Sequence, residues 1–350
     1  MGQDAPFSSG VIEGFFGAPW SYETRIALIK AWAKLGISSY VYAPKSDRNL
    51  REGWRRPHTQ QQQEHFQVLS RTCRENGLSF GMGLSPYELY KEPLDVAEVQ
   101  LLARVTDLVS LGLDSIAILF DDMRGDVEGL ATSQAHLVNA VHRVFGDQLK
   151  VTMCPSYYTD DPILDRVFGA RPPGYIADLG TLLDPAVGVY WTGPKVCSSH
   201  YPADHLLKIS ERLKRKPLIW DNYPVNDGPK MCKHLHLEPF STRAALLAGA
   251  AGVVVNPMNQ GWLSLLPLSS LEQALTTQGK SRWQLVFSES LQELLARDLA
   301  LFKRGLDEIP PPTTERLVAE YNKHAHPAAT EVISWLRGET IVGPECLTNE

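Results

Sequence analysis

The sequence predicts an α/β fold, a (β/α)8 TIM barrel with a small C-terminal helical extension. Short apolar, β-branched runs alternate with longer segments of helical periodicity between residues 10 and 256. Eight such runs within roughly 250 residues are typical of a barrel of parallel strands. The alternative is an open, doubly wound sheet. No G-x-G-x-x-G follows the first run, and no Walker-type loop occurs anywhere, which favours the barrel.

Each expected strand is one of these short apolar runs. In order, they are Gly10–Phe16, Ser39–Ala43, Ser79–Leu84, Ser115–Phe120, Lys150–Cys154, Gly188–Thr192, Pro217–Asp221 and Gly252–Asn256. The intervening helices are expected at Tyr22–Leu35, Gln60–Glu75, Val96–Leu111, Ser133–Phe145, Tyr175–Leu183, Ala203–Leu213 and Thr242–Leu247. In the first helix, Ser21 stands at the N-cap position and Gly36 at the left-handed C-terminal position.

The pattern changes after Asn256. Helical periodicity continues without further strands, and three consecutive prolines separate the last two helices. These expected helices are Leu263–Leu275, Arg282–Leu301 and Glu315–Leu336. We therefore expect the barrel domain to span residues 1–275 and the helical extension to span residues 276–350.

Charge and composition narrow the class of function. The chain has 34 Lys and Arg against 40 Asp and Glu, a net charge of −6, so it lacks the basic surplus of a nucleic-acid-binding protein. No stretch approaches the ~18 apolar residues of a membrane-spanning helix. The first ten residues have neither a basic nor an apolar stretch, so we expect no secretory leader and a cytoplasmic location.

Aromatic, carboxylate and carboxamide side chains follow nearly every expected strand. In a barrel, catalytic groups lie at the C-terminal ends of the strands, so these side chains should meet at one face. The pair Asp121-Asp122 is the sharpest feature, because it follows an entirely apolar strand. Two neighbouring carboxylates repel each other, which raises one pKa and leaves that group able to act as an acid.

The aspartate pair also has other interpretations. Asp is common in solvated turns and at helix N-caps. Together with Asp126, the pair could instead bind Mg²⁺ through oxygen ligands, although the spacing of a calcium loop is absent. Cys154 ends a strand, but no motif ties a histidine to it, so a buried apolar role is favoured. A basic cluster around Trp54 is either a solvated face or the rim of a site; it comprises Arg48, Arg51, Arg55 and Arg56.

Six short motifs occur in a fixed order along the expected barrel. They are Gly10-Val11-Ile12-Glu13-Gly14-Phe15-Phe16-Gly17, Tyr42-Ala43-Pro44-Lys45, Leu119-Phe120-Asp121-Asp122, Trp191-Thr192-Gly193-Pro194-Lys195-Val196, Ile219-Trp220-Asp221-Asn222 and Asn256-Pro257. With these motifs the chain resembles glycoside hydrolase family 84, the retaining β-N-acetylglucosaminidases that include eukaryotic protein O-GlcNAcases.

The resemblance implies substrate-assisted catalysis, in which the 2-acetamido oxygen of the sugar attacks the anomeric carbon and forms an oxazoline. By the family pattern, Asp121 binds the acetamido N–H and stabilises the developing positive charge. Asp122 protonates the glycosidic oxygen and then deprotonates the incoming water. An intramolecular nucleophile avoids the entropy cost of bringing in a separate one.

The resemblance also assigns substrate-binding residues. Gly14, through its backbone, and Lys45 match residues that bind sugar hydroxyls, and Tyr158 matches the tyrosine that orients the acetamido carbonyl. Trp220 matches a wall of the acetamido pocket, and Asn222 matches a polar group near the reacting centre. Asp227 matches the carboxylate that binds the 4- and 6-hydroxyls of the sugar, and Asn256 matches the asparagine that bonds the same side of the ring. Where the family often has Thr-Glu-Tyr, this chain has Ser156-Tyr157-Tyr158, so Tyr157 is an alternative to Tyr158.

The expected protein is thus an exo-β-N-acetylglucosaminidase that removes terminal β-linked GlcNAc, with protein-bound O-GlcNAc as the favoured substrate and no metal or organic cofactor. The alternatives are a hexosaminidase or hyaluronan-degrading enzyme acting on free glycans, and a catalytically silent sugar-binding barrel. Expected partners are a GlcNAc-bearing glycoprotein or glycan, but neither nucleic acid nor membrane. Because eukaryotic family members dimerise through a helical stalk, the resemblance also allows a homodimer.

Overall fold

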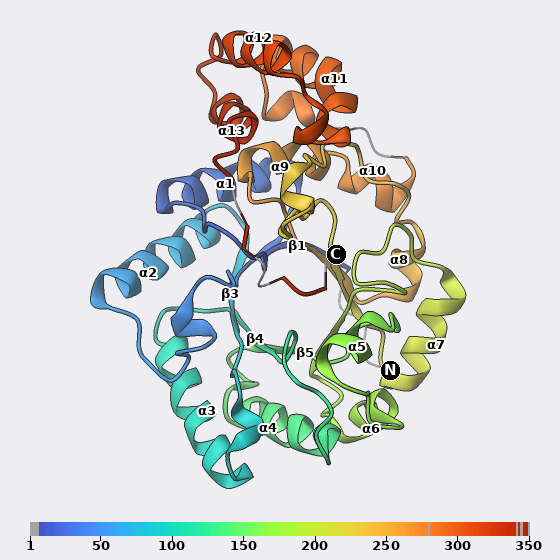
Figure 1. The fold of residues 1–350 in the computed structure, drawn as a ribbon. Coiled ribbons are helices and arrows are strands. Elements are labelled where there is room, and N and C mark those ends of the chain that lie inside the picture. The colour runs from blue at the N-terminus through green and yellow to red at the C-terminus, as the bar shows by residue number, and fades with distance from the viewer. Residues whose placement is uncertain (1–6, 279–280, 341, 344–345, 349–350) are drawn as a thin grey trace.

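Eight parallel strands form a closed barrel surrounded by helices (Figure 1). The computed structural model describes residues 7–278, 281–340, 342–343 and 346–348. The strands follow one another around the barrel in sequence order, and the last pairs with the first through Val11 and Val255. This closure confirms the predicted (β/α)8 barrel and excludes the open sheet.

The strands lie close to the predicted runs. They are β1 (Ser8–Glu13), β2 (Ser39–Tyr42), β3 (Ser79–Leu84), β4 (Ser115–Leu119), β5 (Lys150–Cys154), β6 (Gly188–Trp191), β7 (Leu218–Asp221) and β8 (Gly252–Val255). The predicted end of β1 was too late, because the Gly14 N–H bonds back to the Ile12 carbonyl at 2.9 Å and turns the chain. Phe15 and Phe16 therefore lie in the loop that follows the strand.

The barrel helices alternate with the strands. They are α1 (Tyr22–Leu35), α2 (Gln60–Glu75), α3 (Leu94–Val109), α4 (Leu130–Phe145), α5 (Ile163–Phe168), α6 (Tyr175–Leu182), α7 (Ala203–Leu213) and α8 (Ala245–Gly249). Local capping explains the accurate limits of α1: Ser21 accepts a hydrogen bond from the Thr24 N–H, and Gly36 adopts a φ of 82°. The short α5 was not predicted.

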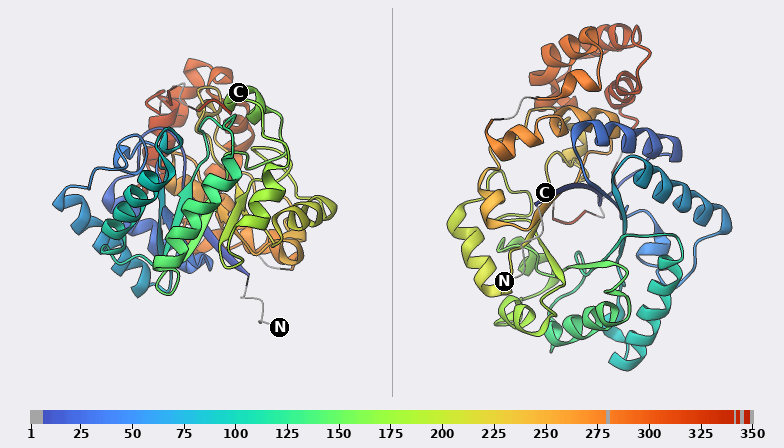
Figure 2. Two further views of the ribbon diagram at one scale, coloured as in Figure 1. Left: turned by 90° about the horizontal axis from the view of Figure 1, so that it is seen from below. Right: turned by 180° about the vertical axis from the view of Figure 1, so that it is seen from behind.

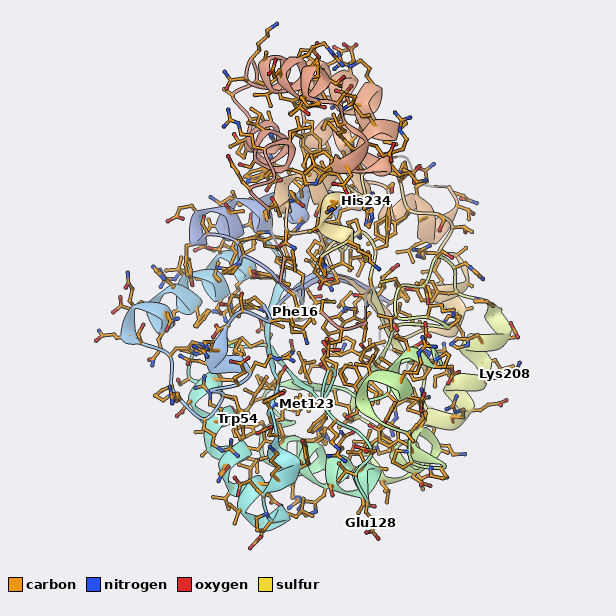
Figure 3. The ribbon with its side chains drawn as sticks, viewed as in Figure 1. Phe16, Trp54, Met123, Glu128, Lys208 and His234 are labelled. Carbon is orange, nitrogen blue, oxygen red and sulfur yellow. The ribbon has the colours of Figure 1, made fainter. Side chains whose placement is uncertain are left out.

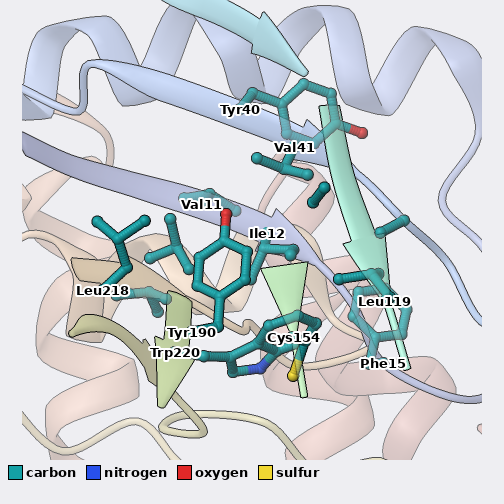
Figure 4. Packing of buried hydrophobic residues seen from close by; sticks show 14 of the residues in the cluster. Val11, Ile12, Phe15, Tyr40, Val41, Leu119, Cys154, Tyr190, Leu218 and Trp220 are labelled. Atoms are coloured by element: carbon teal, nitrogen blue, oxygen red, sulfur yellow. The ribbon is translucent and has the colours of Figure 1, made fainter. Parts of the chain in front are cut away.

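Large side chains fill the interior of the barrel, as Figure 4 shows. Tyr190 and Trp220 pack almost perpendicular to each other, with ring centroids 5.6 Å apart. Tyr190 faces a cavity at the N-terminal end of the strands, whereas Trp220 lines a pocket at their C-terminal end. The two rings therefore form a solid floor beneath that pocket.

The helical extension differs from prediction in how its segments divide. Its helices and the two that precede them are α9 (Gly261–Leu268), α10 (Leu271–Thr276), α11 (Glu289–Arg304), α12 (Pro311–Tyr321) and α13 (Pro327–Leu336). The predicted helix Leu263–Leu275 was wrong, because α9 and α10 take its place. The predicted helix Glu315–Leu336 was also wrong, because α12 and α13 take its place. Pro327 occupies the first turn of α13, where its missing N–H costs nothing, so it begins a helix after a break.

The extension packs on α9 through buried contacts (Figure 2). Glu331 of α13 accepts hydrogen bonds from the N–H groups of Trp262 and Leu263, at 3.1 and 2.8 Å, and so caps α9. The Trp335 indole donates to the Cys232 carbonyl at 3.0 Å.

No helix in the described part of the chain is both long and apolar enough to cross a bilayer. Residues 1–6, which bear on the expected lack of a leader, lie outside that part.

Candidate active site

A pocket with about 400 Å³ of empty space opens at the C-terminal ends of the strands. All nine residues assigned from the sequence line it: Gly14, Lys45, Asp121, Asp122, Tyr158, Trp220, Asn222, Asp227 and Asn256. Figure 3 labels Phe16, which lines the same pocket, and Met123, which follows the aspartate pair. The barrel thus gathers these nine residues around one pocket, although Gly14 and Asn256 are 242 positions apart in the sequence.

Asp121 lies at the base of the pocket, two residues beyond the end of β4. Its Oδ2 forms an ion pair with the Lys45 ammonium, which extends from the loop after β2. Its other oxygen, Oδ1, is buried and has no hydrogen-bond partner among the described residues. Because a buried carboxylate oxygen without a donor is costly, this atom is an acceptor site for an N–H or O–H group of a ligand.

Asp122 differs from its neighbour in both backbone and environment. Its φ of 56° lies in the left-handed region, which non-glycine residues seldom adopt outside turns and functional sites. Its Oδ1 accepts a hydrogen bond from the Tyr158 hydroxyl at 3.2 Å, and its Oδ2 lies 3.9 Å from the Lys45 Nζ. Burial, and next the negative charge of Asp121, raise the pKa of Asp122 against the opposing effect of Lys45.

A chain of side-chain hydrogen bonds fixes another part of the pocket wall, around Trp220 and Asn222. The Gly14 N–H donates to Asn256 Oδ1 at 3.2 Å, and Asn256 donates to Asn222 Oδ1 at 3.0 Å. The Trp220 indole donates to the same Asn222 oxygen at 2.9 Å, while Asn222 donates to the Val196 carbonyl at 3.0 Å. These bonds hold the flat face of Trp220 and the Asn222 amide in one orientation.

Gly14 is required by this packing. A Cβ at position 14 would stand 2.3 Å and 2.8 Å from two ring carbons of Trp220. Any larger residue would therefore push the indole away from Asn222. On the same side of the pocket, Asp227 Oδ2 accepts a hydrogen bond from the Phe16 N–H at 3.0 Å, which orients its carboxylate.

The structure distinguishes between the two adjacent tyrosines. Tyr158 lines the pocket and contacts Asp122. Tyr157 is fully buried elsewhere, where its hydroxyl donates to the Gly169 carbonyl at 2.6 Å and its ring packs against Tyr175. The geometry therefore places Tyr158, and not Tyr157, where a ligand would be.

Other carboxylates at strand ends have structural partners. Glu13 is fully buried and accepts two hydrogen bonds from the Arg25 guanidinium, at 2.7 and 2.9 Å. Asp221 is likewise buried against Arg243 at 2.8 Å. Asp47 accepts from the Tyr42 hydroxyl at 2.9 Å. These pairs stabilise the loops that carry the pocket residues.

The structure also bears on the less favoured interpretations. Asp126 pairs with Arg124 at the surface, with both carboxylate oxygens engaged, so it does not join the aspartate pair in a common ligand set. Burial raises the pKa of the Cys154 thiol well above its usual range, which disfavours a nucleophilic thiolate. Of the basic cluster, Arg51 reaches the pocket rim, where its guanidinium packs on Phe16 and Tyr87.

Several pocket residues were not assigned from the sequence. They are Phe16, Cys154, Thr192, Val196, Cys346 and Thr348. Thr192 and Val196 belong to a motif that follows β6, so the strand-end rule could have found them. Cys346 and Thr348 come from beyond the last helix, and no local pattern in the sequence places them at the barrel mouth.

The pocket therefore combines three chemical capacities. Asp121 offers an unsatisfied acceptor, Asp122 is a carboxyl group with a raised pKa, and Trp220 supplies a flat apolar wall. Asp227 and Asn256 add further polar groups to the pocket lining. Such an arrangement suits a ring with one apolar face, several hydroxyls and an amide substituent.

The chain is similar to proteins of one known family. Residues 9–303 match a family described as beta-N-acetylglucosaminidase. The chain is 33% identical over 266 residues to the protein O-GlcNAcases of Mus musculus and Rattus norvegicus, covering 72% of this chain but only 28% of theirs. A solved mutant of Thermobaculum terrenum O-GlcNAc hydrolase aligns with a TM-score of 0.78 and 26% identity, over 95% of this chain and 81% of its own.

Proposed function

This chain belongs to glycoside hydrolase family 84, the β-N-acetylglucosaminidase family, and on that basis we propose that it hydrolyses terminal β-linked GlcNAc with net retention by substrate-assisted catalysis. The observation that carries the proposal is the unsatisfied Oδ1 of Asp121 beside an Asp122 of raised pKa. The first atom is an acceptor for the acetamido N–H, and the second group is an acid for the leaving oxygen.

In the first step the acetamido oxygen attacks the anomeric carbon and the glycosidic C–O bond breaks. The proton of Asp122 passes to the departing oxygen. Asp121 accepts the N–H hydrogen bond, which strengthens as positive charge develops on the amide, and Lys45 holds the Asp121 carboxylate in place. Since the nucleophile is part of the substrate, its attack carries no separate entropy cost of association.

In the second step water attacks the anomeric carbon and gives its proton to the Asp122 carboxylate. The C–O bond of the oxazoline ring breaks, which restores the acetamido group and the β configuration. Tyr158 lies 3.2 Å from Asp122 and supports the proposal, because its hydroxyl is close enough to orient an acetamido carbonyl beside the acid. Asn222, which lines the same pocket, is the proposed polar group near the reacting centre.

The rest of the sugar would lie between Trp220 and Asp227. Trp220 forms a wall for the acetamido group, and Asp227 with Asn256 and Lys45 would bind hydroxyls, as would the backbone of Gly14. The names of the mouse, rat and Thermobaculum relatives support O-GlcNAc on proteins as the natural substrate. A GlcNAc-bearing protein is therefore the proposed partner.

Asp121→Asn tests the proposal directly. The Asp121 carboxylate would stabilise the positive charge that develops on the acetamido group, so its loss should lower kcat with every leaving group. We expect a decrease of roughly 10²–10³-fold, which is the typical effect of removing one preorganised electrostatic contact from an active site. Asp126→Asn is the matched control, because that carboxylate pairs with Arg124 at the surface of the same loop. Near-normal turnover of aryl N-acetyl-β-glucosaminides by Asp121→Asn would reject the assigned role.

The substrate class needs a separate comparison. An O-GlcNAc-modified peptide and a chitin oligomer should be tested side by side with the unmodified chain. The proposal predicts the larger kcat/KM for the peptide. Preference for the oligomer would instead identify a hexosaminidase of free glycans, and GlcNAc binding without turnover of either substrate would identify a sugar-binding barrel.

A further inference from the structure

The chain beyond α13 returns to the mouth of the barrel. In Figure 1 its dark red trace leaves the helical extension and crosses the face where the strands end. Cys346 and Thr348 line the same pocket as the two aspartates. We refer to the described residues between 342 and 348 as the strap.

Apolar contacts anchor the strap on the rim of the pocket. Val342 and Cys346 are buried in a small cluster with Phe16 and Cys232, separate from the main core. Just before the strap, the Gln260 amide donates to the Thr340 hydroxyl at 3.1 Å. Contacts at Val342 and Cys346 therefore hold the strap at two points on the rim.

Within the pocket, the strap touches two residues that the proposed function assigns to the sugar. The Cys346 Sγ lies 3.7 Å from Asp227 Oδ1, at the end of the pocket assigned to the far hydroxyls. The Thr348 side chain hydrogen-bonds to Tyr158, at the end assigned to the acetamido group. A pyranose bound between Tyr158 and Asp227 would occupy the space that these two side chains fill.

The strap also extends to the side from which a polypeptide would approach. Asp122 lines both the pocket and a neighbouring groove with about 730 Å³ of empty space. Leu347 lies in that groove with Tyr87, Tyr90 and Phe168. A leaving group protonated by Asp122 must lie beside it, so the strap covers both the sugar side and the leaving-group side of the acid.

We propose that the strap is an autoinhibitory segment, which occupies the sugar pocket and the adjacent groove and must leave before substrate binds. The proposal rests on the proposed function for the assignment of the pocket to GlcNAc. Its competition is steric and involves no bond formation. If the open form were one tenth of the population, the apparent Kd and KM of the sugar would rise about tenfold.

Cys346→Asp in the full chain tests the proposal, because a second carboxylate beside Asp227 would repel the strap. Leu347→Asp is a second variant. Leu347 is 52% exposed, so the substitution does not disturb the hydrophobic core, and the new carboxylate would face Asp122 across the groove. Val144→Asp serves as the control, because it adds the same charge at an exposed position of α4 that is distant in sequence from the strap.

The Kd of N-acetylglucosamine, measured by titration calorimetry, reports on pocket access whether or not the chain turns over substrate. We expect Cys346→Asp to lower it about tenfold, Leu347→Asp to lower it less, and Val144→Asp to leave it unchanged. The KM for an aryl N-acetyl-β-glucosaminide should fall in parallel. A synthetic peptide of residues 338–350 should restore the weaker binding to Cys346→Asp by competition.

The outcomes separate the two proposals. If the strap variants bind N-acetylglucosamine with a lower Kd but no form turns over substrate, the autoinhibitory role of the strap is supported and the proposed activity is overturned. If Kd and KM are equal in the unmodified chain and all three variants, and turnover is normal, the autoinhibitory role of the strap is overturned and the proposed activity is supported. Absence of GlcNAc binding in every form would overturn both.

Discussion

Replacing Asp122 by asparagine separates its acid role from its contribution to binding. The amide has nearly the same size and can still accept from the Tyr158 hydroxyl, which lies 3.2 Å from Oδ1. It can also remain near Lys45, 3.9 Å from Oδ2. Substrate binding should therefore change little, whereas the proton for the leaving oxygen is lost.

The size of the effect should depend on the leaving group. A serine or threonine alkoxide departs only when protonated, so kcat/KM for an O-GlcNAc peptide should fall by the ~10²–10⁴-fold typical of general acid catalysis. A dinitrophenolate departs without a proton, so its kcat/KM should fall by less than ~10-fold. The assay is a comparison of the two substrates on wild type and Asp122→Asn.

The second step gives an independent check on the same variant. Water needs Asp122 as a base, but azide is a nucleophile that carries no proton. Azide should therefore accelerate turnover of the dinitrophenyl substrate by Asp122→Asn and yield the β-glycosyl azide. Equal losses with both leaving groups, together with no azide effect, would refute the assignment of Asp122 as the acid and base.

Three further predictions concern the pocket and its support. Gly14→Ala forces a Cβ to within 2.3 Å of the Trp220 ring, so kcat/KM should fall by roughly 10²-fold in steady-state assays; an unchanged value would show that the indole need not be fixed. Arg25→Met leaves buried Glu13 without its cation, so denaturant unfolding should show about 3–5 kcal/mol of lost stability, against little change for exposed Arg56→Met. Because the pKa of Asp122 is raised and the acid must be protonated, kcat/KM should fall as pH rises through that pKa, and Asp122→Asn should lack this limb.

The sequence predicted the barrel well because each strand is a short apolar run, and because side-chain caps at Ser21 and Thr59 begin the first two helices. The same regularity placed Asp121 and Asp122 at a strand end, and hence at the face where a pocket forms. Period-two alternation could not distinguish Tyr157 from Tyr158, since both lie beyond the end of β5. Only the folded loop determines which ring turns toward the pocket.

What the sequence did not predict depends on long-range contacts. The position of Cys346 beside Asp227 joins residues 119 positions apart, and no periodicity encodes such a pairing. Arg51 was one of four cationic side chains in a cluster, and its contact with Phe16 depends on how two loops meet. The break before α13 was missed because helical periodicity continues on both sides of Pro327.

The central claim is that the acetamido group of the substrate is the nucleophile, assisted by Asp121. Successive fluorine substitution on the acetyl methyl group withdraws electrons from that oxygen and changes little else in the substrate. We predict that kcat/KM of the unmodified chain falls steeply from the acetyl to the trifluoroacetyl aryl glycoside. A kcat/KM that is independent of fluorine number would show that another group attacks the anomeric carbon, and would contradict the mechanism.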